Sequence, residues 1–435
     1  MKKAFVFILT VMLCVVIALG LIACGETEEK VETPAIKGPA EDVSIYHSGE
    51  GYETVNDPLT WDAINAFPVV HDGMTIEEGK SLVVDFFRYS KRAVWIPNES
   101  YEYKIKETSK DTQVLDGRIK FGGLPYMSYG SGSVYRLMDY MDQETHVANV
   151  TKAGKNQVLF GSQCSYGSYV GVGRVINSAR YALTKNMTVK YGFVKVGDYI
   201  YDDNVDTYKN GVYNTVNILE ENGEERMYEC YAGLKKGDVA VYFTNAGHVI
   251  LISEDAYVIR DGSGKVDPEQ SYVTIIDQTA SLTTMTNEAD DTFTYEKSVD
   301  AKMTFQKLFS GHYIPFTFKE WLGEDPIESS KTEYSHTGDS ISLEGIFGTK
   351  VTSNYGISDI YVSIYNAKDI EVYKMATRAD TPSTLELAFE RPGHDNADTW
   401  GTQANIFEDQ EYTVKVYAQL YTGERPTLWE GKLEQ

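Results

Sequence analysis

Cysteine is scarce in this chain. Its 435 residues contain four cysteines, Cys14, Cys24, Cys164 and Cys230. So few thiols exclude the disulfide framework that stabilises many small exported domains. Each cysteine therefore needs an explanation of its own.

Positive charge is scarce too. The chain has 40 lysines and arginines against 64 aspartates and glutamates, and its net charge is −24 at pH 7. So acidic a surface repels nucleic acid and anionic phospholipid, both of which attract basic patches. We therefore expect no nucleic-acid partner, and membrane attachment has to come from a lipid.

Long apolar runs are rare, and the longest, residues 4–23, follows Lys2 and Lys3 directly. This is the arrangement of an export signal. The run ends in Leu21-Ile22-Ala23-Cys24, which resembles the lipobox of bacterial lipoproteins. The resemblance implies a signal peptide over residues 1–23 and acyl chains, palmitate among them, on Cys24. They would anchor the protein to the extracytoplasmic face of the bacterial cell membrane. An uncleaved transmembrane anchor is the alternative.

The next segment, residues 24–55, is rich in glutamate and proline and has few large apolar side chains. Such a composition cannot form a core, so we expect a disordered tether. A globular pattern follows. Thr75 and Glu78 have the spacing of a capping box, and apolar residues recur behind them at helical spacing. We predict a helix over residues 76–92.

Cys164 is the candidate nucleophile. Turn residues precede it, and Val172, Ile176, Ala179 and Leu183 then follow one face of a helical period. A thiolate at the start of a helix is stabilised by the unpaired N–H groups of the first turn and by the helix dipole. We interpret the other thiol, Cys230, as a buried bystander. A disulfide between Cys164 and Cys230 is the alternative.

Three apolar segments downstream predict antiparallel strands. They are residues 239–243, 249–252 and 272–276, with turn residues between them. His248 opens the second strand and Asp277 follows the third, so we expect the two side chains at equivalent ends of neighbouring strands. A catalytic base and the residue that orients it need this placement. Gln278 and Glu254 are alternatives to Asp277.

The order of these motifs resembles the NlpC-type and CHAP-type cell-wall cysteine peptidases, which belong to the broad papain-like group. The resemblance covers roughly residues 115–320 and rests on Gly123-Leu124-Pro125-Tyr126, Gln163-Cys164-Ser165, Leu234-Lys235-Lys236-Gly237-Asp238-Val239, Gly247-His248-Val249 and Asp277. The chain departs from the family at Gln163, where the family usually has aspartate. The segment between Tyr126 and Cys164 is also longer than usual.

The resemblance implies an α+β fold: a papain-like core, with the nucleophile's helix packed on an antiparallel sheet, in a peptidase domain over residues 56–328. In the implied site Cys164 attacks, His248 is the base and Asp277 orients it, while Tyr126, Gln163 and Ser165 bind substrate. We expect no cofactor and no metal. Asp202, Asn204 and Asp206 begin like a calcium loop, but Thr207 and Tyr213 replace its essential glycine and glutamate.

The last segment, residues 329–435, contains recurrent short strand patterns separated by turn residues. This spacing predicts an all-β immunoglobulin-like sandwich, with no catalytic set and a role as a spacer or binding module.

Two classes of function remain. The first is a lipid-anchored extracytoplasmic thiol hydrolase that cleaves amide bonds, with the peptides of peptidoglycan as substrate. The second is a non-catalytic surface-binding lipoprotein on a peptidase-like scaffold, or an acyltransferase that uses the same thiol. The sequence leaves the oligomeric state and the type of cell envelope open.

Overall fold

The structure is a computed structural model. It describes residues 58–434 except for 106–111, 118, 129, 151–159, 179–183, 185–186, 188–191, 203–212, 245, 281, 287–291, 297–298 and 401–410. The predicted signal peptide 1–23, the lipid site Cys24 and the tether 24–55 lie outside the described residues. Among the residues that are described, no helix has the length and apolar character to cross a membrane.

The helices are short except for α3. Their bounds are α2 Trp61–Ala66, α3 Ile76–Arg92, α4 Val134–Asp139, α5 Cys164–Val172, α7 Thr215–Asn222, α8 Glu224–Ala232, α9 Phe305–Ser310, α10 Lys319–Leu322 and α11 Leu343–Ile346. Helix α3 confirms the prediction for residues 76–92. Its capping box is formed, because Thr75 accepts from the Glu78 amide while the Glu78 carboxylate accepts from the Thr75 amide.

Two sheets and a hairpin come before residue 320. The first sheet has the order β10-β11-β4-β1-β5, from Leu282–Thr286, Thr292–Glu296, Lys120–Gly122, Val94–Pro97 and Val147–Ala148. The second has the order β12-β9-β8-β7-β13-β6, from Val299–Thr304, Tyr272–Asp277, Gly247–Tyr257, Val239–Phe243, Ile314–Phe318 and Phe193–Lys195. Strands β2 (Tyr101–Lys104) and β3 (Thr112–Leu115) form the hairpin. The three predicted strands are confirmed as β7, β8 and β9, which pair antiparallel.

Two further sheets lie beyond residue 330. One has the order β14-β16-β19, from Thr332–Tyr334, Lys350–Ser353 and Glu386–Ala388. The other has the order β15-β22-β21-β17-β18-β20, from Ser340–Ser342, Thr427–Glu434, Thr413–Leu420, Ile357–Tyr365, Glu371–Arg378 and Ala397–Trp400.

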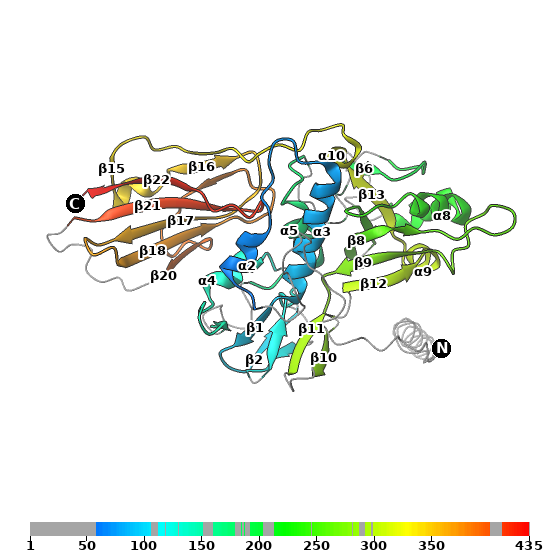
Figure 1. The fold of residues 1–435 in the computed structure, drawn as a ribbon, viewed down its shortest axis with the longest axis horizontal. Helices are drawn as coiled ribbons and strands as arrows, with labels where there is room; N and C mark the ends of the chain where they lie inside the picture. Colours follow the sequence, from blue (N-terminus) through cyan, green and yellow to red (C-terminus); the bar gives the residue numbers. More distant parts are fainter. Residues whose placement is uncertain are drawn as a thin grey trace, which may run out of the picture.

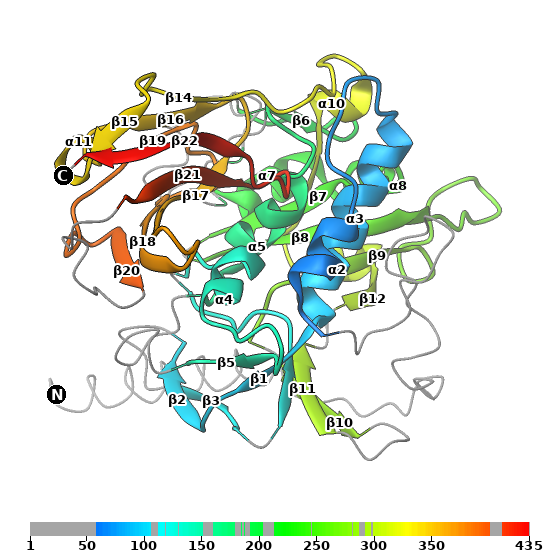
Figure 2. The same cartoon turned by 60° about the vertical axis from the view of Figure 1, so that its left-hand side comes forward.

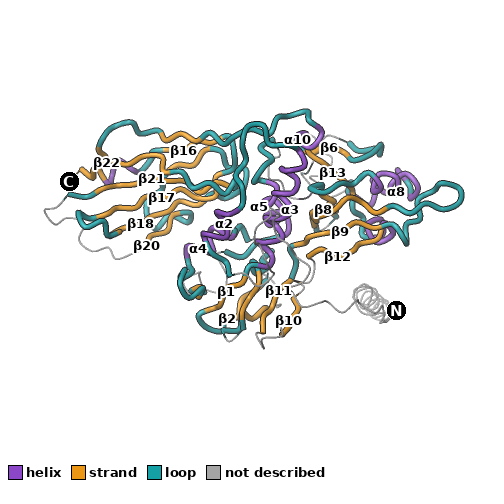
Figure 3. Tube along the Cα trace, in the orientation of Figure 1, coloured by secondary structure: helices purple, strands orange, loops and turns teal. Residues whose placement is uncertain are grey.

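The expected fold class, a papain-like core followed by an immunoglobulin-like sandwich, is wrong. The protein is mostly β, with 35% strand and 23% helix, and its small sheets are arranged like a four-bladed β-propeller. Figures 1 and 3 show the sheets placed around the central helices α3 and α5. The sheets are assembled from distant segments: Phe121 of β4, for example, pairs with Thr294 of β11. Short-range sequence patterns do not report such pairings.

The helix that begins at Cys164 is shorter than predicted. It ends at Val172, and Gly173 caps it. The chain then turns so that Arg174 becomes fully buried, with its guanidinium 3.9 Å above the Phe86 ring. The glycines around Val172 favour this early end, because glycine is a poor helix former. Ile176 is buried outside the helix, and residues 179 and 183 lie outside the described chain.

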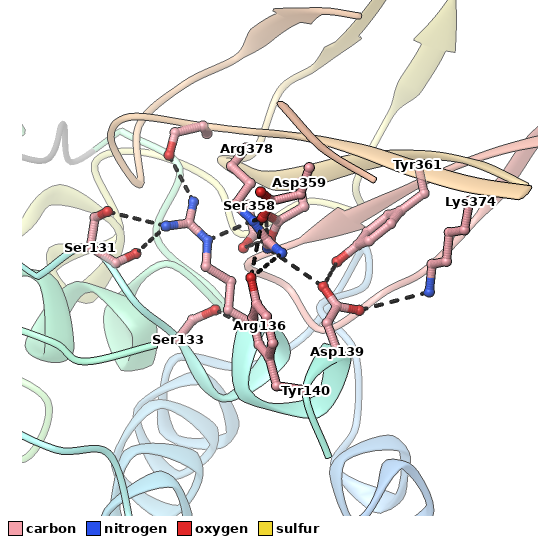
Figure 4. A network of polar contacts seen from close by, with 12 residues as sticks. Ser131, Ser133, Arg136, Asp139, Tyr140, Ser358, Asp359, Tyr361, Lys374 and Arg378 are labelled. Atoms are coloured by element: carbon pink, nitrogen blue, oxygen red, sulfur yellow. Dashed lines mark hydrogen bonds and ion pairs between the residues drawn. The ribbon is translucent and has the colours of Figure 1, made fainter. Parts of the chain in front are cut away.

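The C-terminal sheets are joined to the rest of the chain through α4 and α5, which lie beside them in Figure 2. Figure 4 shows the polar part of this junction. The Asp359 carboxylate is contacted by Arg136 of α4 at 3.3 Å and by Arg378 at 2.9 Å, and Tyr361 donates a 2.8 Å hydrogen bond to Asp139. These charges are buried, so separating the two parts would leave uncompensated ions.

Candidate active site

Cys164 is the first residue of α5 and is only 6% exposed. The preceding residue, Gln163, is the helix N-cap, and within the described chain its side chain makes no capping hydrogen bond. The first-turn N–H groups therefore receive no acceptor from the cap side chain. Such groups, together with the helix dipole, favour negative charge at this point.

The loop that carries Tyr126 lies against the segment leading to Cys164. Tyr126 forms a bridge with Ser162, whose carbonyl accepts from the Met127 amide at 3.1 Å. Position 132 in the same loop has to be glycine, because a Cβ there would lie 2.0 Å from the Phe160 carbonyl oxygen. The structure thus pairs Tyr126 with a residue that lies two positions before Cys164 in the chain.

His248 reaches Cys164 from the start of β8. Gly247 precedes it, and its carbonyl oxygen lies 3.9 Å from the Cys164 sulfur. A Cβ on Gly247 would lie 1.7 Å from the Thr184 hydroxyl oxygen, so no larger residue fits there unless the structure shifts. This close approach explains the glycine of the Gly-His-Val motif.

Asp277 contacts His248 through its carboxylate. His248 Nε2 lies 2.7 Å from Asp277 Oδ1, and both side chains are largely buried. The thiol and the carboxylate both interact with the same imidazole. This is the relation of nucleophile, base and orienting group in acyl-transfer enzymes.

These neighbours decide the charge of His248. Burial alone would lower the pKa of its imidazole, but the charge and hydrogen bond of Asp277, helped by Cys164, raise the pKa to about 10. His248 is therefore protonated at neutral pH between two potential anions. A protonated imidazole beside a thiol is half of a thiolate–imidazolium pair, and it holds a proton for a leaving amine.

The two alternatives to Asp277 are placed elsewhere. Gln278 is fully buried; its Oε1 accepts from Lys91 Nζ at 2.6 Å, and its Nε2 donates to the Leu124 carbonyl at 3.2 Å. Gln278 thus ties α3 to the loop that carries Tyr126. Glu254 lies on the exposed part of β8. Asp277 is the candidate for which the described part of the chain shows a contact with His248.

The remaining predicted residues differ in accessibility. Gln163 is half-buried at the N-terminal end of α5, whereas Ser165 is only 2% exposed. The second thiol, Cys230, is buried in α8, and burial raises its pKa to about 11. Both Cys164 and Cys230 are free, so the alternative of a disulfide between them is wrong.

Sequence analysis missed two tyrosines beside the site. Tyr242 of β7 is directly opposite His248, with ring centroids 6.1 Å apart, and Tyr313 meets Tyr242 edge to face at 5.1 Å. Burial, with added effects from Asp277 and Cys164, raises the pKa of Tyr313. Strand alternation in residues 239–243 could have indicated Tyr242. Tyr313 has no local signal, because its strand joins the sheet from far along the chain.

Comparison with known proteins gives no family for this chain. No protein-family model matches it, and no curated protein sequence matches it either.

Proposed function

We propose that this protein is a thiol hydrolase that cleaves amide bonds with Cys164, His248 and Asp277. The observation that carries the proposal is the position of His248, which interacts with the Cys164 thiol and lies 2.7 Å from the Asp277 carboxylate. The three residues come from α5, β8 and β9, so rigid elements hold them.

The proposed chemistry proceeds in two stages. The Cys164 thiolate attacks the amide carbonyl, and the C–N bond breaks as the His248 imidazolium gives its proton to the leaving amine. Neutral His248 then takes a proton from water, which attacks the thioester and releases a carboxylic acid and the free thiol. Asp277 accepts from the Nε2–H throughout, which keeps the imidazole oriented.

The start of α5 supplies a donor for the oxyanion. The Cys164 N–H lies in the first turn, where an amide has no partner within the helix. Gln163 and Tyr126 flank the same position and are the proposed substrate contacts. A single oxyanion donor is typically worth about 3 kcal/mol in the barrier.

The proposed substrate is the peptide of peptidoglycan, and an endopeptidase is favoured over an amidase. The support is the predicted export signal with its lipid site at Cys24 and the motif resemblance to cell-wall peptidases. A lipid on Cys24 would hold the enzyme on the extracytoplasmic face of the membrane, near this polymer.

The test is cleavage of purified peptidoglycan fragments by the full chain, followed by mass spectrometry. We expect new fragments with the unchanged protein and none with Cys164→Ala. The matched control is Cys230→Ala, which removes the other free thiol and should keep the activity. Intact fragments with every protein, or equal cleavage by Cys164→Ala, would overturn the proposal.

A further inference from the structure

One face of the six-stranded sheet carries a row of polar side chains that continues past the proposed catalytic residues. Asp277 pairs with Ile250, two residues along β8 from His248, and Tyr242 of β7 pairs with His248 itself. Directly opposed residues of antiparallel strands project to the same face, as do residues two apart on one strand. Asp277, His248 and Tyr242 therefore share a face.

The next strand, β13, adds a fourth member. Its first residue, Ile314, pairs with Val241, and extending this register by one residue puts Tyr313, which immediately precedes the strand, opposite Tyr242. The edge-to-face contact of the two rings, at 5.1 Å, fits this register. Across neighbouring strands the row runs Asp277, His248, Tyr242, Tyr313. Tyr313 is thus on the other side of His248 from Asp277.

The hydroxyl of Tyr313 has an unusual position. The residue is only 8% exposed, and no group in the described part of the chain accepts or donates a hydrogen bond at this hydroxyl. Its backbone, by contrast, is fixed, since Tyr231 donates to the Tyr313 carbonyl at 2.7 Å. The hydroxyl oxygen itself is not sealed from solvent, so a ligand that reaches it can accept its hydrogen bond.

The charges of the site act on this hydroxyl. Burial, followed by the effects of Asp277, Tyr242 and Cys164, raises the pKa of the Tyr313 phenol. The phenol therefore stays protonated and can donate a hydrogen bond. A donor beside the base suits a peptide carbonyl, which has only acceptor lone pairs at its oxygen.

We propose that Tyr313 is a substrate-binding residue whose hydroxyl donates to a backbone carbonyl of the bound peptide, with the Tyr242 ring forming the surface between Tyr313 and His248. The inference rests on the proposed hydrolase function and deepens it. The substrate has to present a carbonyl acceptor on the β13 side of His248, as a peptide does on either side of its scissile bond.

The test compares Tyr313→Phe with Tyr257→Phe in the full chain. Tyr257 is the matched control, because it lies on the same sheet, is 50% exposed and stacks on Tyr272 away from the row. Two rates are measured: kcat/KM for cleavage of peptidoglycan fragments, and alkylation of Cys164 by iodoacetamide. The small reagent has no peptide to contact Tyr313, so it reports whether the thiol itself is intact.

We expect Tyr313→Phe to lower kcat/KM about tenfold or more, as sites lose when a hydrogen bond to substrate is removed. Its alkylation rate should stay within about twofold of the unchanged protein, and Tyr257→Phe should leave both rates unchanged. If the unchanged protein is active and Tyr313→Phe has the same kcat/KM, the inference about Tyr313 is overturned while the proposed hydrolase function stands. If Tyr313→Phe lowers the alkylation rate as much as it lowers kcat/KM, the role of Tyr313 is structural and the inference is also overturned. A parent that cleaves nothing removes the proposed function and this inference together.

Discussion

Tyr421 of the C-terminal part places its hydroxyl 2.5 Å from the hydroxyl of Tyr166, which is two residues after Cys164 in α5. The Tyr421 ring also contacts Tyr135 and Tyr169 edge to face. The helix that begins at Cys164 is therefore packed directly against the C-terminal part. This contact gives residues 329–435 a structural role beside the site, in addition to the predicted role of a spacer or binding module.

The tyrosine pair predicts a measurable coupling. Tyr421→Phe breaks the buried hydrogen bond to Tyr166 and should lower the free energy of unfolding by about 1 kcal/mol. The double variant Tyr166→Phe/Tyr421→Phe should lose less than the sum of the single losses, because each single change already breaks the shared bond. Urea unfolding measures all three. Strict additivity would show that the pair does not interact.

The buried ions of Figure 4 predict a larger effect. Asp359→Ala removes the carboxylate that Arg136 and Arg378 both contact and should cost roughly 3 kcal/mol or more of unfolding free energy. Glu344→Ala is the comparison, since Glu344 and Arg391 form an ion pair that is largely exposed. A cost for Asp359→Ala no greater than for Glu344→Ala would contradict a buried network.

The charge of His248 predicts a pH titration. With a pKa raised to about 10, its ring should stay protonated well above neutral pH, and Asp277→Asn should move the titration lower because it removes the carboxylate charge. NMR of the imidazole C–H resonances follows both. The raised pKa stabilises the folded state fully below about 6.5, the ordinary value, and this stabilisation is lost as pH rises toward 10. If His248 titrates near pH 6.5 and Asp277→Asn does not change this value, the contact between His248 and the Asp277 carboxylate is contradicted.

Asp238 lies in the turn before β7 and is a second group whose titration should make the free energy of unfolding depend on pH. Burial raises the pKa of its carboxyl to about 7, although the Lys235 amide donates to it at 2.8 Å. The folded state therefore holds a proton that the unfolded state loses near pH 3.8. Stability from this group falls as pH rises from about 4 to 7.

The change that tests this is Asp238→Asn, which cannot ionise. Relative to the unchanged protein, this variant should become more stable at pH 8 than at pH 4, as measured by urea unfolding at each pH. Because only the difference between the two proteins is compared, the other titrating groups cancel. A difference that does not vary with pH would show that Asp238 does not bind a proton in this range.

Local signals in the sequence were sufficient for several elements. The capping box at Thr75 and the apolar period behind it gave the bounds of α3, and apolar segments bounded by turns gave β7, β8 and β9. Because β8 and β9 pair antiparallel, these strands also brought His248 and Asp277 together. This part of the site depends on neighbouring strands alone.

The contacts between distant segments of the chain could not be predicted from the sequence. The pairing of β13 with β7 places Tyr313 beside Tyr242, and no pattern near Tyr313 reports a partner so far away. The contact of Tyr421 with Tyr166 is of the same kind. The predicted fold class was wrong for the same reason. It was inferred from the order of local motifs, whereas the sheets pair strands that lie far apart in the chain. The early end of α5 depends on burying Arg174, another tertiary contact.

The proposed mechanism requires that water releases an acyl group from Cys164 with the help of His248. The most direct measurement is cleavage of peptidoglycan fragments in water enriched in oxygen-18, with mass spectrometry of the products. One heavy oxygen should appear in each new carboxyl group, and Cys164→Ala and His248→Ala should form no product. No cleavage by the unchanged protein, products without heavy oxygen, or cleavage that persists in Cys164→Ala would contradict it.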